Sequence, residues 1–105
     1  HQKLKDANFT LKSGDVIEIA DLCEKLLNGG YTRSELCDGT GQFSIRGGIF
    51  DIYPVNQKDP VRIEFWGDEV DSISTFDILS QRRNENIEKV ELFPAGELIC
   101  NKTEL

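Results

Sequence analysis

The chain has 105 residues, of which 30% are charged and 38% are hydrophobic, and 12 basic against 19 acidic side chains give a net charge of −7. This length allows one domain with one modest core, and no apolar run approaches the ~20 residues that a membrane helix needs. The acidic balance disfavours nucleic acid as the main partner and favours solubility or a basic protein partner.

The cysteines, Cys23, Cys37 and Cys100, form no C-x-x-C pair, and His1 is the only histidine. A disulfide framework or a zinc site would need more thiols or more histidines. The sequence therefore predicts a cytoplasmic protein with reduced thiols, without a metal site and without a cofactor.

A helix is expected in the first third of the chain. Asp15 is a suitable N-cap with Glu18 three residues later, as in a capping box. The apolar residues between Val16 and Leu27 recur at the spacing of one helix face, which we expect to pack on the core. Asn28–Gly30 provides a stop, with a glycine able to adopt the left-handed cap.

The other expected elements are strands joined by tight turns. An edge strand is expected over 9–11, and further strands over 31–36, 43–46, 49–53, 61–66, 70–76 and 90–94. A hairpin turn is expected at Gly67–Asp68, and residues 77–87 look polar, with at most one helical turn. One helix with many short strands predicts an α+β domain, an antiparallel sheet with the helix packed on one face. The expected domain spans 9–98, between a flexible arm (1–8) and a tail (99–105).

The residues give little support for catalysis. The glycine-rich stretch 39–48 lacks Gly-Lys-Ser/Thr and leads into a strand, so turns around a strand explain it better than a phosphate-binding loop. Cys23 lies on the apolar helix face without a histidine base. Glu64, Asp68 and Asp71 cluster near a hairpin, where carboxylates are usually solvated. A small acidic enzyme using them is the weakest alternative, and a pocket that raises a carboxyl pKa would favour it.

A polar strand face is the best candidate for function. Strand periodicity places Arg62, Glu64 and Trp66 on one face of their strand and the apolar residues between them on the other face. In the same way, Ser44 and Arg46 lie on the opposite face of their strand from Phe43 and Ile45. If these strands are neighbours, arginines and a carboxylate gather on one face. Such a face is either an interface, for which arginine and aromatic residues are favoured anchors, or an ordinary solvated sheet surface.

Several strings together resemble a known family. They are GYTR (30–33), GQFSIRGGIFDIYP (41–54), PVRIEFWGDEVDSI (60–73), Phe76–Asp77, Gln81–Arg82 and FPAGE (93–97). In this order they resemble the UvrB-like module of bacterial transcription-repair coupling factors, the Mfd family, and the related region of UvrB. Gly47–Asp51 and the pairs Phe76–Asp77 and Gln81–Arg82 favour the coupling factors over UvrB.

The resemblance implies a domain that docks onto UvrA and recruits excision repair to stalled transcription. RNA polymerase and DNA would be contacted only by other domains of the parent protein, and this chain lacks the motor motifs of an ATP-dependent translocase. UvrB's UvrA-contacting positions fall on Arg33, Ser44, Arg46, Arg62 and Glu64, where Ser44 departs from the arginine of UvrB. Phe50, on the next strand, is added to this expected contact set as an apolar anchor. The alternatives are the equivalent domain of UvrB itself and a scaffold domain that holds flanking segments of a larger motor protein.

Overall fold

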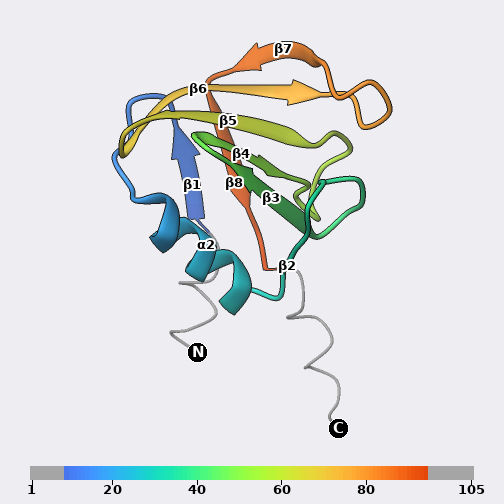
Figure 1. Ribbon diagram of the computed structural model, residues 1–105, viewed down its shortest axis with the longest axis horizontal. Coiled ribbons are helices and arrows are strands. Elements are labelled where there is room, and N and C mark those ends of the chain that lie inside the picture. Colours follow the sequence, from blue (N-terminus) through green and yellow to red (C-terminus); the bar gives the residue numbers. More distant parts are fainter. Residues whose placement is uncertain (1–8, 95–105) are drawn as a thin grey trace, which may run out of the picture.

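The computed structural model describes residues 9–94, and the expected arm and tail, with Cys100, lie outside these residues (Figure 1). The described chain has one helix and eight strands, in the order β1 (Phe9–Lys12), α2 (Ile19–Asn28), β2 (Thr32–Arg33), β3 (Gln42–Arg46), β4 (Ile49–Ile52), β5 (Val61–Trp66), β6 (Glu69–Phe76), β7 (Arg83–Ile87) and β8 (Lys89–Leu92). The predicted α+β class is therefore confirmed. In the described part of the chain, no helix is long and apolar enough to cross a membrane.

Six strands form one sheet in the order β2-β3-β4-β5-β6-β7, and β1 pairs with β8 in a separate two-stranded ribbon. All neighbours are antiparallel except β2 and β3, which run parallel. The expected hairpin at Gly67–Asp68 is confirmed, since Trp66 pairs with Glu69 across it. The ribbon and α2 lie on the same side of the large sheet (Figure 1).

The core fills the space between the sheet, the helix and the ribbon. Ile45, Phe50, Ile63 and Ile73 stand in register across four neighbouring strands, and the last three are at most 1% exposed. The helix adds Leu22 and Leu26, and the ribbon adds Leu11, Val90 and Leu92. Burying each large apolar side chain stabilises the fold by roughly 1.5–3 kcal/mol, so this face of the sheet is committed to stability.

The predicted start of the helix is wrong. The helix begins at Ile19, and the Asp15 carboxylate instead accepts a hydrogen bond from the Lys12 backbone N–H. Residues 14–17 pair with the β5–β6 hairpin: Ile17 N–H bonds to the Asp68 carbonyl, and the Val70 N–H to that of Asp15. The hairpin end satisfies backbone groups that a longer helix would otherwise have used.

The end of the helix is as predicted. The Tyr31 N–H bonds to the Leu26 carbonyl and the Gly30 N–H to that of Leu27, which is the Schellman pattern. Gly30 has φ +95°, a left-handed value that glycine adopts without strain. This cap turns the chain directly into β2.

Two expected strand assignments need correction. The strand expected over 31–36 contains only Thr32–Arg33, because the chain then leaves the sheet toward Cys37. Residues 83–87, expected to be irregular, form β7 at the edge of the sheet. Four of its five side chains are exposed, so this strand lacks the apolar alternation from which a strand is predicted.

Candidate functional site

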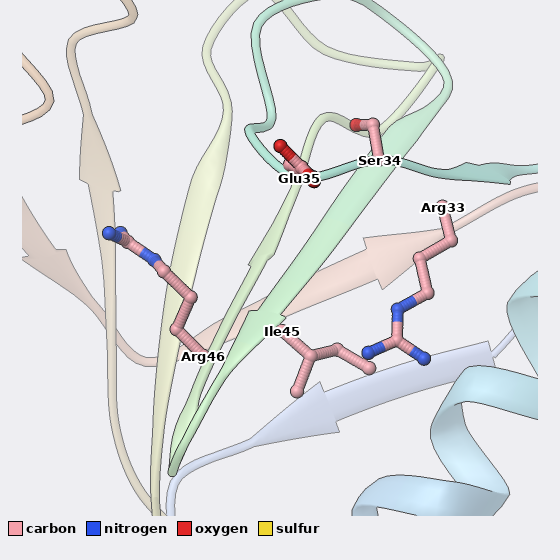
Figure 2. A pocket seen from close by; sticks show the side chains of 5 residues that line it. All are labelled: Arg33, Ser34, Glu35, Ile45 and Arg46. Atoms are coloured by element: carbon pink, nitrogen blue, oxygen red, sulfur yellow. The ribbon is translucent and has the colours of Figure 1, made fainter.

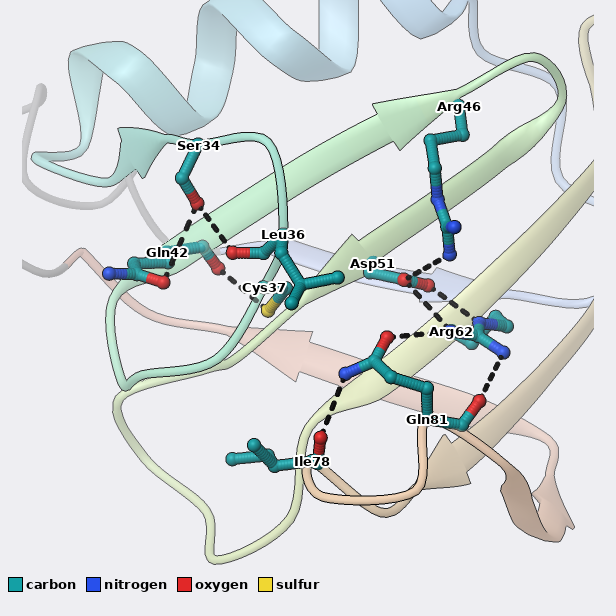
Figure 3. A network of polar contacts seen from close by, with 9 residues as sticks. All are labelled: Ser34, Leu36, Cys37, Gln42, Arg46, Asp51, Arg62, Ile78 and Gln81. Carbon is teal, nitrogen blue, oxygen red and sulfur yellow. Dashed lines mark hydrogen bonds and ion pairs between the residues drawn. The ribbon is translucent and has the colours of Figure 1, made fainter.

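A polar row crosses the face of the sheet opposite the helix. Ser44, Asp51, Arg62 and Ser74 stand in register across β3, β4, β5 and β6, and none is more than 9% exposed. Two loops supply further atoms to this region (Figure 3): segment 34–41, which carries Cys37, and segment 77–82, which carries Gln81. The polar face found from periodicity therefore exists, but its centre is buried.

The centre of the row is a buried ion pair. Arg62 donates from Nε and Nη2 to the two carboxylate oxygens of Asp51, at 2.8 and 3.0 Å. Its Nη1 donates to the Gln81 carbonyl at 3.0 Å, and its guanidinium lies 4.6 Å from the centre of the Phe76 ring. The hydrogen bond to Asp51 raises the pKa of Arg62 above its ordinary value, although burial opposes this shift. Arg62 is thus fully engaged inside the domain.

Arg46 reaches the same carboxylate from the surface. Its Nη2 lies 3.6 Å from Asp51 Oδ2, while the side chain remains 54% exposed. Asp51 is itself held by Arg62, so a buried pair orients an accessible guanidinium (Figure 3). Arginine's planar fork is suited to bidentate contacts with a partner's carboxylates.

Further along this face lie an ion pair and an exposed aromatic ring. Arg83 of β7 pairs with the Glu64 carboxylate, and about a quarter of the Glu64 side chain is exposed. Trp66, two positions after Glu64 on β5, is 80% exposed. An accessible indole beside oriented charges is a typical interface anchor.

The remaining predicted site residues lie elsewhere. Phe50 is fully buried in the core, stacked on Phe43 with ring centres 5.4 Å apart, so it offers a partner no surface. Ser44 belongs to the polar row but is also buried, at 1% exposed. Arg33 is exposed on β2, where its register partner is the core residue Phe43. The structure thus keeps Arg46 and Glu64 on one polar face and separates Arg33 from them.

Two members of this region escaped the sequence argument. Asp51 stands between the apolar residues Phe50 and Ile52, and a lone carboxylate in an apolar strand is itself a signal of a buried partner. Arg83 could be found only once β7 was known to lie beside β6.

Cys37 closes one side of the buried row. The side chain is fully buried, and its Sγ–H donates to the Gln42 carbonyl at 3.4 Å. Burial, supported by the nearby Asp51 and Asp38 carboxylates, raises the pKa of the thiol to about 12. This thiol is therefore protonated at neutral pH and is a packing element, not a nucleophile.

The acidic hairpin residues weighed as catalytic groups lie on the surface. Asp68 and Asp71 are exposed, and the Glu64 carboxylate is already paired with Arg83. Over residues 9–94, no three His, Cys, Asp or Glu side chains are grouped as metal ligands. The geometry of these acids gives no argument for an enzyme.

Known proteins share the sequence of this domain. A family model described as the UvrB interaction domain matches residues 9–98. Proteins named transcription-repair-coupling factor are similar: those of Staphylococcus haemolyticus and of Staphylococcus epidermidis strain RP62A are 45% and 47% identical over 95 residues, 90% of this chain. That of Bacillus subtilis is 42% identical over 100 residues, 95% of the chain. The chain spans 8% of the length of these relatives.

Proposed function

The chain belongs to the UvrB interaction domain family, and from this premise we propose that it docks onto UvrA and recruits nucleotide excision repair to stalled transcription complexes. The relatives named transcription-repair-coupling factor favour this context over that of UvrB itself. The role is recruitment by binding, and RNA polymerase and DNA would be contacted by other parts of a longer protein.

The observation that carries the proposal is the state of Arg46. Its guanidinium is half exposed, yet the buried Asp51 carboxylate holds it in place. Less side-chain entropy is lost when such a preorganised group binds a partner than when a free surface arginine does. Trp66 and the Glu64–Arg83 pair extend the surface with an aromatic anchor and two further charges.

This arrangement revises the expected roles of two residues. Arg62 acts as a positioning residue, because its donors are used on Asp51 and Gln81 inside the domain. Glu64 orients Arg83 in place of Arg62. We therefore place Arg46, Glu64, Arg83 and Trp66 in the docking surface and leave Phe50 out.

The test is binding of the domain to purified UvrA with and without a charge reversal. We expect Arg46→Glu to weaken binding at least about tenfold, because a contact made by a positioned charge is replaced by repulsion. Lys89→Glu is the matched control, since it changes the net charge equally on the exposed side of the separate ribbon. Equal affinities for Arg46→Glu and the wild type would refute the site.

A second readout uses the single tryptophan of the chain. With 5-fluorotryptophan incorporated, the domain gives one ¹⁹F signal, from Trp66. We expect this signal to shift when UvrA is added. An unchanged signal in a saturated complex would remove Trp66 and its surroundings from the docking surface.

A further inference from the structure

One edge of the large sheet is left open. β2 pairs only with Gln42 and Phe43 of β3, so the second half of β3, from Ser44 to Arg46, has no strand on this side among the described residues. On the other side β3 pairs with β4 along Phe43–Arg46. The unpaired half-strand is a template for another extended chain.

The backbone groups of Ile45 point to this open side. The two-residue turn Gly47–Gly48 makes Arg46 and Ile49 the closing hydrogen-bonded pair of the hairpin, and such pairs alternate along antiparallel strands. Ser44 and Arg46 therefore bond toward β4, while Ile45 directs its N–H and C=O away from it. Consistent with this, the Phe43 carbonyl, two residues earlier, accepts the Ser34 N–H on the β2 side.

A groove of about 470 Å³ lies along this edge, lined by Arg33, Ser34, Glu35, Ile45 and Arg46 (Figure 2). The two arginines extend in different directions from the two sides of Ile45 (Figure 2). By register, Arg33 shares its side of the sheet with Phe43, whereas Arg46 lies on the polar face with Ser44. An exposed arginine therefore lies on each face of the sheet at this open edge.

We propose that β3 is extended at this edge by a strand of the partner, an extended acidic segment that hydrogen-bonds to Ile45 and places carboxylates on both faces, toward Arg33 and Arg46. The inference rests on the proposed docking to UvrA and states how that docking is built. Side chains of an added strand alternate between the two faces of a sheet, so two acids of opposite parity reach one arginine each. Main-chain bonds supply affinity in this mode, and side-chain contacts supply specificity.

The charges of the groove favour a foreign strand over a second copy of this chain. Glu35 is the one acid that lines it, against two arginines. Two copies joined through this edge would bring their arginines together, and like charges at close range oppose pairing. The opposite edge of the sheet, β7, carries instead the mixed polar sequence Arg83–Asn86 with exposed side chains.

The test is amide hydrogen exchange of the ¹⁵N-labelled domain, alone and bound to purified UvrA, with exchange quenched before the domain is released and read by NMR. We expect the Ile45 amide to exchange rapidly in the free domain and to slow at least about tenfold in the complex, because it gains a hydrogen bond there. The Ser44 amide, which is already bonded to β4 and points away from the open edge, should change little.

Each other outcome overturns the inference in a distinguishable way. If a complex forms and the Ile45 amide exchanges as fast as in the free domain, the added strand is excluded, and docking to UvrA still stands. Protection of Ile45 that grows with domain concentration in the absence of UvrA identifies a second copy as the occupant. Absence of any complex removes the proposed function itself, and the inference with it.

Discussion

At the scale of residues, some charged side chains of the polar face stabilise the fold and others are accessible to a partner. The sequence resemblance treats Arg46 and Arg62 alike, yet one is half exposed and the other is 9% exposed and bound to Asp51. Strand periodicity correctly placed both on the polar face. It could not show that two loops cover the centre of that face, because loop paths depend on tertiary contacts such as that between Gln81 and Arg62.

The division predicts opposite phenotypes for two alanine variants. Arg62→Ala should lower the free energy of unfolding by about 3–5 kcal/mol, because it leaves the Asp51 carboxylate buried and unpaired. Arg46→Ala should cost less than about 1 kcal/mol, since the Arg46 side chain is half exposed and Asp51 keeps both hydrogen bonds from Arg62. Urea unfolding measures both.

A double variant separates the ion pair from mere packing. Asp51→Leu with Arg62→Met replaces both charges with apolar groups and should recover much of the stability lost by Arg62→Ala. A single Arg62→Ala variant as stable as the wild type would show that the pair does not hold the polar face together.

At the scale of elements, errors of sequence interpretation occur where tertiary hydrogen bonds override local pattern. Residues 14–17 have a helical pattern but bond to the β5–β6 hairpin. β7 has no apolar alternation and is a strand only because β6 offers it an edge. The helix end, by contrast, depends on a local glycine cap, and it could be predicted.

The loop from Asp77 to Arg82, which covers part of the polar row, has a conformation that can be tested. Asp77 N–H bonds to the Arg82 carbonyl, the Asp77 carboxylate accepts the Ser80 N–H, and Gln81 has φ +64°. Gln81→Gly should therefore be more stable than Gln81→Ala by about 1 kcal/mol, because alanine retains the cost of a left-handed conformation. Thermal unfolding of the two variants gives the difference, and both lose the same side-chain contacts.

Position 80 is the matched control for this pair. Ser80 does not have a positive φ, so Ser80→Ala should be the more stable of its alanine and glycine variants. The same order at both positions would contradict the account of the loop.

At the scale of the whole molecule, strand order decides which charges meet. The sequence correctly indicates an acidic domain with a polar strand face, but β3 and β5 are not neighbours, and β4 between them contributes Asp51. The same order leaves Arg33 on the far side of the sheet edge from Arg46. Local periodicity does not determine the order of strands in a sheet. The role of Asp51 and the separation of Arg33 from Arg46 could therefore be learned only from the structure.

The most direct test of the central claim is calorimetric titration of the domain into purified UvrA at low and high salt, for example about 0.05 M and about 0.3 M. The Debye length, over which charges interact, is markedly shorter at the higher concentration. We expect saturable binding that weakens as salt rises, because oriented surface charges contribute to the contact. Absence of binding by a domain that circular dichroism shows to be folded, or an affinity unaffected by salt, would contradict a charge-complementary docking module.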